Sequence, residues 1–328
     1  MIFATTDVDT AEGTILAHSV ALPAGKLAKG TRLTGADCAR LRAAGITHVQ
    51  TARLEPGDQH EDTAAARIGT LLHSPGLEMT TAHRGRANLV ATAPGLVRVS
   101  TGAVTALNAI DEGLTLATLP DAARVAAGQL VATVKIIPYA LPEEVVTAGE
   151  AALGTPPIRH LPFLGGRARL ILTRTPGFKE SLLAKGADVV ERRLTALGYD
   201  MDAPVIVPHE TGAIAGALSD RSDLVLILGA SATSDRADVA PAAVEAAGGV
   251  IHRFGMPVDP GNLLFLGEIG GTPVVGLPGC ARSPALNGVD WVLERLAAGI
   301  KVTGADIAAM GVGGLLKEMP GRPEPRQR

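Results

Sequence analysis

The fold of this chain is indicated most clearly by residues 223–291, which read DLVLILGASATSDRADVAPAAVEAAGGVIHRFGMPVDPGNLLFLGEIGGTPVVGLPGCARSPALNGVDW. Residues 223–228 are a short apolar run, as expected of a buried strand, and Gly229 follows them at the start of a loop. The loop, residues 229–238, contains small and polar residues. A helix is predicted from about Val239. The stretch therefore begins with a strand, a small-residue loop and a helix.

The same arrangement recurs later in the stretch. Residues 263–266 and 273–277 are two more apolar runs, and the second is followed by the loop 278–283 and a predicted helix over 284–298. In an open α/β sheet such loops lie at the carboxyl ends of strands, where ligands bind. Backbone N–H groups that are free at a helix N-terminus favour an anion such as a phosphate. The pattern therefore predicts an anion site at this edge of a sheet.

Strands and helices also alternate upstream. Residues 168–175 are predicted to be a strand and 179–197 a helix with apolar residues at helical spacing, followed by a short strand over 205–207 and a helix over 211–218. Such alternation is typical of a mostly parallel sheet that is covered on both faces. We therefore expect the α/β fold class, as a three-layer α/β/α domain over residues 161–300.

The rest of the chain is predicted to form smaller α+β segments in front of this domain and an extension after it. The expected segments are 1–73, a small α+β segment; 74–160, a β-rich middle region and linker; 161–300, the α/β domain; and 301–328, a C-terminal extension with a flexible end. Thr34 precedes a helix with Asp37 three residues later, a capping-box variant. Asp58 is expected to cap a second helix.

Composition excludes several classes of protein. The formal net charge of the 328 residues is -3, which argues against binding to nucleic acid or to an anionic membrane. The first residues have neither the basic nor the apolar region of a signal peptide. No apolar run approaches the length of about 18 residues that a membrane span needs. Cys38 and Cys280 are too few for a disulfide framework, so a cytoplasmic protein is expected.

Several sequence blocks follow one another in a specific order. They are Gly229-Ala230-Ser231-Ala232, Asp238-Val239-Ala240-Pro241, Pro260-Gly261-Asn262-Leu263, Gly270-Gly271-Thr272-Pro273-Val274 and Leu277-Pro278-Gly279-Cys280-Ala281. Their order and spacing resemble the molybdopterin-binding domain that molybdopterin adenylyltransferase and molybdopterin molybdotransferase share, and residues 167–299 carry the resemblance. Residues 11–17 and 29–34 are similar to molybdotransferase segments that precede this domain. The whole chain also resembles the front half of bacterial fusions with a molybdenum cofactor cytidylyltransferase-like domain.

The chain also departs from the family's pattern. Ala230 stands where the family has its second loop glycine, and Ser231-Ala232 replaces a Thr-Gly pair. Cys280-Ala281 replaces the final Asn-Pro, and the molybdotransferase motif Asp-Asn-Ser-Ala-Met-Asp is missing. These departures weigh against catalysis more than against binding.

The resemblance implies a set of site residues. The pterin phosphate would be held by the loop residues Gly229, Ala230, Ser231, Ala232, Thr233 and Ser234. The same cleft would be lined by Pro278, Gly279, Cys280, Arg282, Ser283, Thr173, His209 and Glu210. Asp235 and Asp238 compete for the family's acidic role, as catalytic residues that hold Mg²⁺, an ion that prefers oxygen ligands. For Asp238 a purely structural role as a helix cap remains open. An ordinary loop and turn remain open for the other segments.

The function that the resemblance implies is binding of molybdopterin or molybdenum cofactor, during biosynthesis, maturation or delivery of that cofactor. Whether the protein is an enzyme stays open; if it is, the chemistry would be Mg²⁺-dependent nucleotidyl or molybdate transfer. The alternatives are a non-catalytic carrier or partner of a cytidylyltransferase or molybdoenzyme, and a nucleotide hydrolase on the same fold. A homo-oligomer is expected, because relatives of this domain associate.

Overall fold

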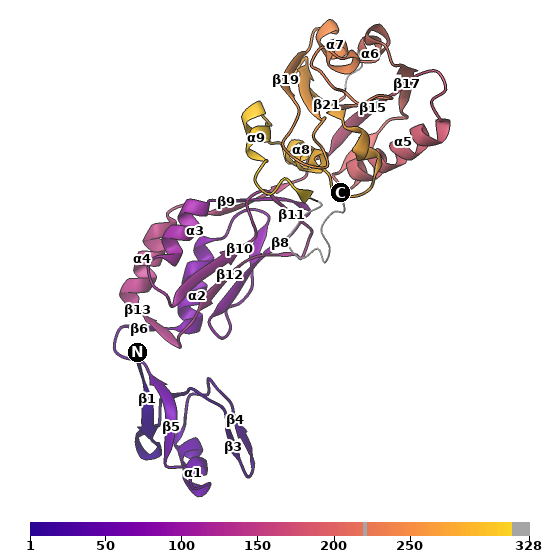
Figure 1. Cartoon of the computed structure of the whole chain (residues 1–328). Coiled ribbons are helices and arrows are strands. Elements are labelled where there is room, and N and C mark those ends of the chain that lie inside the picture. Colours follow the sequence, from indigo (N-terminus) through magenta and orange to yellow (C-terminus); the bar gives the residue numbers. More distant parts are fainter. Residues whose placement is uncertain (219–221, 317–328) are drawn as a thin grey trace. The chain divides into compact units, whose positions relative to one another are not determined.

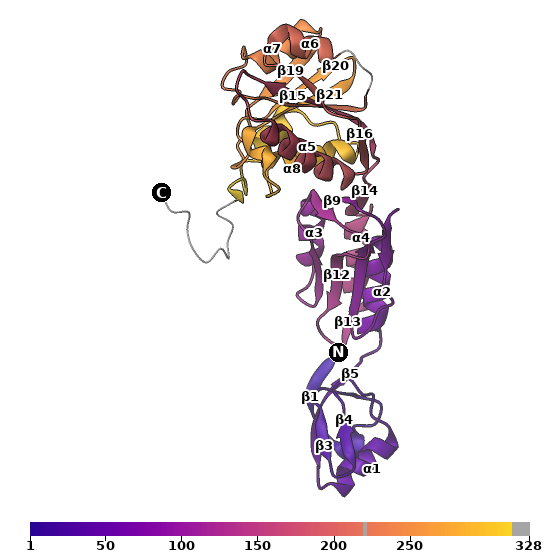
Figure 2. The ribbon, with the colours of Figure 1, turned by 90° about the vertical axis from the view of Figure 1, so that its right-hand side faces the viewer.

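A computed structural model describes residues 1–218 and 222–316 of the chain. The chain forms two compact units, Met1–Pro162 and Phe163–Arg328, which follow each other from indigo to yellow in Figure 1 and Figure 2. The predicted flexible end of the C-terminal extension lies outside the described residues. Within those residues no helix is long and apolar enough to cross a membrane.

The first unit begins with a small three-stranded sheet. Its elements are β1 (Ile2–Asp7), η1 (Val8–Thr10), β2 (Ile15–Leu16), the hairpin of β3 (Val20–Leu22) and β4 (Gly25–Leu27), α1 (Gly35–Ala43) and β5 (His48–Arg53), with sheet order β1-β5-β2. The predicted capping box at α1 is confirmed, because Thr34 and Asp37 each accept the other's backbone N–H at 3.2 Å. Gly45, with φ of +75°, follows this helix in a conformation that favours glycine.

The remainder of the first unit packs three helices with two antiparallel sheets, ordered β10-β12-β8-β7 and β11-β9-β14. The elements are β6 (Asp58–His60), α2 (Glu61–Leu71), β7 (Leu77–Met79), β8 (Arg86–Ala91), β9 (Gly95–Val99), α3 (Thr101–Asn108), β10 (Leu114–Thr118), β11 (Ala123–Val125), β12 (Leu130–Ile136), β13 (Ala140–Pro142), α4 (Glu143–Leu153) and β14 (Ile158–Pro162). Ile68 of α2, Leu107 of α3 and Val146 of α4 are fully buried in one core.

The prediction that Asp58 caps α2 is wrong. Asp58 lies in β6, which pairs with β13, so the chain at this point is extended. The N-cap of α2 is His60, whose ring accepts the backbone N–H of Asp62. The carboxylate of Asp58 instead accepts the backbone N–H of Glu55 at 2.7 Å. The hydrophilic run before α2 gave no signal of this short β-pair, whose partner lies about 80 residues away.

The second unit is built on one seven-stranded sheet. Its order is β16 (Tyr199–Met201), β15 (Gly166–Arg174), β18 (Leu224–Leu228), β21 (Thr272–Leu277), β20 (Phe265–Ile269) and β19 (Val250–Phe254), with β17 (Val205–Pro208) also paired to β15. All pairs that involve β15 or β18 are parallel, whereas β20 pairs antiparallel with its two neighbours, β19 and β21. The sheet is therefore mostly parallel, as predicted.

Helices cover both faces of this sheet (Figure 1). The helices are α5 (Glu180–Thr195), α8 (Gly288–Ala297) and α9 (Gly304–Ala309) on one face, and α6 (Thr211–Ala217) and α7 (Val239–Ala246) on the other. Leu226 of β18 packs in the first core, whereas its neighbours Val225 and Ile227 pack in the second. Because side chains alternate along a strand, every residue of this central strand is buried. The three-layer α/β/α architecture is thus confirmed.

Candidate functional site

The candidate site lies where parallel strands of the second unit end. β15 ends at Arg174, β17 at Pro208, β18 at Leu228 and β21 at Leu277. Because these strands are linked by parallel pairing, their carboxyl ends lie along one edge of the sheet. In open α/β sheets this edge is where ligands bind. The sequence-predicted site residues follow these strand ends.

Thr173 joins two of the strand-end loops. Its side chain is fully buried near the end of β15. Its Oγ1 accepts the backbone N–H of Ala230 at 2.7 Å and lies 2.8 Å from Nδ1 of His209, at hydrogen-bond distance. The backbone N–H of His209 in turn donates to the carbonyl oxygen of Arg174 at 2.9 Å. Thr173 thus fixes the start of the small-residue loop relative to the exit of β17.

The other end of the small-residue loop is fixed by Asp238, the N-cap of α7. Its Oδ1 accepts the N–H of Val239 at 2.7 Å, and its Oδ2 accepts the N–H of Ser234 at 3.0 Å. These N–H groups, that of Ser234 first, hold the pKa of the Asp238 carboxyl below its usual value, and the nearby His209 adds to the effect. The structural cap role of Asp238 is therefore real, and it leaves further lone pairs of the carboxylate free.

Between these two anchors the loop offers unpaired donors. The backbone N–H groups of Ser231, Ala232 and Thr233 make no hydrogen bond within the described residues. Ser231 and Ala232 are exposed, and Thr233 is half-buried. Successive backbone N–H groups of this kind, next to a helix N-terminus, form a site that suits an anion.

Asp235 has a local structural role as well. Its Oδ1 accepts the N–H of Ala237 at 2.7 Å, and its backbone carbonyl accepts the N–H of Asp238 at 3.2 Å. Its side chain is exposed. In the part of the chain that the structure describes, no three His, Cys, Asp or Glu residues gather into a group that could hold a metal.

Arg282 brings a positive charge to the start of the same loop. Its Nη2 donates to the carbonyl oxygen of Gly229 at 2.6 Å, and its guanidinium carbon lies 5.9 Å from the ring centre of Phe178. Its Nε is buried and has no hydrogen-bond partner. Burial lowers the pKa of this guanidinium, which nevertheless stays charged.

The segment around Arg282 differs from the prediction. Pro278 is the N-cap of a short 3-10 helix, η2 (Gly279–Arg282), and α8 begins only at Gly288. The predicted helix over 284–298 therefore starts four residues too early, and Arg282 and Ser283 do not lie in its first turn. The helix starts at Gly288 because Asn287 and Asp290 form a capping box, in which the side chain of each accepts the backbone N–H of the other.

Asn287 also contacts Cys280. Its Nδ2 donates to Sγ of Cys280 at 3.0 Å, and Cys280 is exposed. Ser283 uses its Oγ to accept the N–H of Ala285 at 3.3 Å. Cys280 and Ser283 are thus accessible but already engaged by neighbours along the chain.

Arg193 of α5 holds this segment in place, and the sequence did not single it out. Its Nε donates to Oδ1 of Asp290, and its Nη1 to the carbonyl of Ala281, each at 2.7 Å. Its Nη2 donates to the carbonyls of Ser283 and Ala285, at 2.7 and 3.0 Å. In sequence Arg193 looks the same as the exposed Arg192 beside it, so no local signal distinguishes them.

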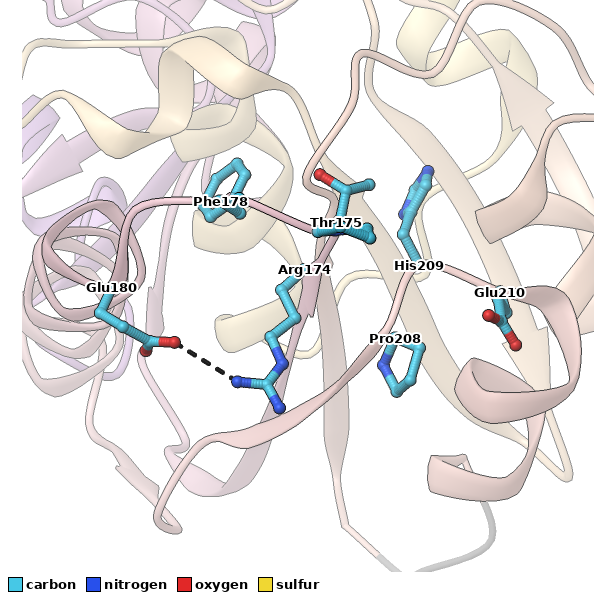
Figure 3. Close-up of a pocket in the computed structure, with 9 residues that line it drawn as sticks. Arg174, Thr175, Phe178, Glu180, Pro208, His209 and Glu210 are labelled. Atoms are coloured by element: carbon cyan, nitrogen blue, oxygen red, sulfur yellow. Dashed lines mark hydrogen bonds and ion pairs between the residues drawn. The ribbon is translucent and has the colours of Figure 1, made fainter.

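A hollow of about 400 Å³ lies beside His209. It is lined by Arg174, Thr175, Pro176, Gly177, Phe178, Glu180, Pro208, His209 and Glu210. Figure 3 shows the residues around the end of β15 beside those around the end of β17, with Arg174 and Glu180 bridged at 3.3 Å. The small-residue loop does not line it, but Cε1 of His209 lies 3.6 Å from the position that a Cβ on Gly229 would take.

A second hollow, of about 290 Å³, lies next to Arg282. It is lined by Leu182, Lys185, Gly279, Cys280, Arg282, Ser283 and Pro284. Phe178 lines the first hollow and Arg282 the second. The structure thus brings the residues predicted after β15, β17, β18 and β21 to one edge of the sheet, and the contact between Arg282 and Phe178 joins the linings of two hollows.

Comparison with known proteins gives matches for two segments. Residues 5–53 match the family described as "Domain of unknown function (DUF8806)", and residues 178–298 match the family described as "Probable molybdopterin binding domain". The comparison with curated proteins finds no match.

Three solved structures are representative of those similar to this chain. The molybdopterin biosynthesis moea protein from Pyrococcus horikosii is 15% identical to this chain, with a TM-score of 0.31. The match covers 91% of this chain and 76% of that protein. A molybdopterin biosynthesis protein from Mycobacterium abscessus is 17% identical to this chain, with a TM-score of 0.28. The match covers 41% of this chain and 92% of that protein. The protein CinA with unknown function from Thermoplasma acidophilum is 18% identical to this chain, with a TM-score of 0.25. The match covers 35% of this chain and 89% of that protein. The segment 178–298, which matches the probable molybdopterin-binding domain, contains the small-residue loop and η2.

Proposed function

We propose that this protein binds molybdopterin or its nucleotide in the biosynthesis, maturation or delivery of molybdenum cofactor, with a phosphate of the ligand on the loop 229–234. The observation that carries the proposal is the row of free N–H groups at Ser231, Ala232 and Thr233, held between two anchored ends. The family match of the surrounding segment supports the pterin as the ligand.

Arg282 supplies the charge that this binding needs. It is placed at the first residue of the loop by its bond to the carbonyl of Gly229. A hydrogen bond to a charged group contributes about 1.5–3 kcal/mol, more than one between neutral groups. A phosphate that accepts from the loop and from the guanidinium of Arg282 would therefore bind more tightly than the loop alone allows. The hollow beside His209 has room for the rest of the ligand.

Mg²⁺ enters the proposal as a bridge between ligand and loop. Asp235 and Asp238 each use carboxylate oxygens as backbone acceptors and retain lone pairs for a cation. Mg²⁺ commonly binds through one or two carboxylates and completes its octahedron with phosphate oxygens and water. If the protein is an enzyme, this arrangement suits nucleotidyl or molybdate transfer, because in-line phosphoryl chemistry depends mainly on positioning and charge neutralisation.

A non-catalytic carrier, which hands the cofactor to a cytidylyltransferase or a molybdoenzyme, is the second candidate. The observation that favours it is that both acidic side chains already stabilise the backbone, and that Ala230 and Cys280 depart from the family pattern. Turnover separates the two: an enzyme consumes a nucleotide or molybdate in the presence of Mg²⁺, whereas a carrier only binds.

The test is anaerobic calorimetry of the full chain with molybdopterin and with adenylylated molybdopterin, each with and without Mg²⁺. We expect one of these forms to bind, and Arg282→Gln to weaken binding about tenfold or more, a change of about 1.4 kcal/mol. Arg192→Gln is the matched control, because Arg192 is exposed and bonds only a backbone carbonyl of its own helix. Absence of binding to every form contradicts the proposal.

A further inference from the structure

The first unit contains a hollow of its own, of about 570 Å³. It lies between the turn that follows α2 and the segment that leads from α4 into β14. Its lining residues are His73, Ser74, Pro75, Thr155, Pro156, Arg159, His160 and Leu161, all within Met1–Pro162. Small-molecule sites in proteins have volumes of roughly 300–1,000 Å³ and mostly apolar walls with a few polar groups. The hollow has this size and, with its prolines and Leu161, this kind of wall.

The charges around this hollow have one sign. His73 and Arg159 are exposed at it, and no Asp or Glu lines it. The guanidinium of Arg159 has neither an ion pair nor a hydrogen bond in the ranges 1–218 and 222–316. Arg98 of the same unit, in contrast, pairs with Asp121 at 2.9 Å. An unpaired fork of N–H donors beside an apolar wall suits a carboxylate or another planar anionic group.

His160 forms part of the wall of the hollow. Its side chain lines the hollow and is only 7% exposed, and neither ring nitrogen has a hydrogen bond of normal geometry. Gly76 and Gly95 make room for the ring, since a Cβ on either would collide with a ring nitrogen. Burial lowers the pKa of His160, and a backbone hydrogen bond with Ala93 opposes this effect. Because both ring nitrogens are buried against Gly76 and Gly95, His160 contributes the face of its ring to the wall of the hollow and no hydrogen bond to a ligand.

We propose that this hollow binds a small organic anion with a flat apolar body. The anionic group lies on the guanidinium of Arg159, and the flat body lies against Pro75, Pro156 and Leu161, next to His160. Charge complementarity selects the anion, because all the charged or titratable side chains that line the hollow are basic. The apolar wall selects a flat ring over a fully hydrated ion. The site lies in the first unit and does not depend on the pterin proposal.

The experiment is an NMR titration of the full chain with 2-naphthoate, a flat aromatic carboxylate, and with its neutral analogue 2-naphthalenemethanol. We expect saturable binding of 2-naphthoate at one site and binding of the alcohol about tenfold weaker. Arg159→Gln should weaken naphthoate about tenfold and leave the alcohol unchanged, since a charged hydrogen bond is lost. Arg86→Gln is the matched control, an exposed arginine of the same unit that does not line the hollow.

A second variant tests the location without relying on charge. Thr155 is exposed at the hollow, so Thr155→Trp fills the space while it leaves the buried core untouched. We expect this variant to keep the circular dichroism and melting temperature of the parent and to lose binding of both probes. The proposal is overturned if neither probe binds, if Arg159→Gln binds naphthoate as well as the parent does, or if Thr155→Trp still binds it.

Discussion

Replacing Thr173 with valine should detach the small-residue loop from the sheet edge. Valine has the shape of threonine, so the buried position at the end of β15 stays filled. The change removes the acceptor of the Ala230 N–H, at 2.7 Å, and the partner of the His209 ring, at 2.8 Å. Both the loop start and the imidazole are then free to move. We expect lower stability of the second unit and weaker ligand binding together.

The size of the effect follows from these two hydrogen bonds. Each contributes about 1 kcal/mol net, and a donor left unsatisfied costs about 1–3 kcal/mol if it is buried. Ala230 is only half-buried, so the lower end of that range applies. Thr173→Val should therefore lower the free energy of unfolding by about 2–3 kcal/mol. Thr173→Ser keeps the hydroxyl and loses one methyl group, which costs only about 1 kcal/mol.

Urea denaturation followed by tryptophan fluorescence measures this free energy. Trp291 is the only tryptophan of the chain and packs against the core of the second unit, so its emission reports on that unit. Calorimetry on the same variants gives the ligand affinity. If Thr173→Val is as stable as the serine variant and binds the pterin as tightly as the parent, Thr173 does not position the loop and the reasoning is refuted.

Three further predictions concern the same unit. Asp238→Asn should make the free energy of unfolding less sensitive to acid. The native pKa of Asp238 is lowered, so the stabilising contribution of its carboxylate is present above about pH 4 and is lost as the pH falls through the native pKa. An equal loss of unfolding free energy between pH 6 and pH 3 in parent and variant would contradict this prediction. Arg193→Met should lower the free energy of unfolding by about 3 kcal/mol or more, because it leaves Asp290 and the carbonyl of Ala281, both part-buried, without a partner and also removes two bonds to exposed carbonyls. Arg192→Met should change urea stability by less than about 0.5 kcal/mol. Similar losses in the two variants would show that Arg193 does not hold the segment. Residues 163–328 expressed alone should fold and keep pterin affinity within about tenfold, since they have their own cores; a folded but non-binding fragment would show that the first unit contributes to the site.

The sequence predicted the parts of the fold that local patterns determine. The apolar run of β18 is buried on both sides, as its lack of alternation indicated, and the glycine after it marks the loop. The capping box at Thr34 and Asp37 is present because both partners lie within one turn. In these cases the residues that interact are neighbours in the sequence, so their pattern carries the information.

Features that depend on distant segments could not be predicted in this way. Arg193 differs from Arg192 only because the η2 segment, about 90 residues later, returns to it. The hollow of the first unit forms because the turn after α2 meets β14, where Ser74 bonds the carbonyl of Ile158, 84 positions later. The bond between Thr173 and Ala230 likewise joins two strand ends 57 positions apart. No periodicity or motif shows which distant segments come together.

The most direct test of the central claim compares molybdopterin with its dephosphorylated form by anaerobic calorimetry on the full chain. The claim is that the N–H groups of Ser231, Ala232 and Thr233, with Arg282, bind the phosphate. Loss of the phosphate should then weaken binding at least about a hundredfold, or about 2.7 kcal/mol. Equal affinities for the two forms would show that the phosphate lies elsewhere and would contradict the account.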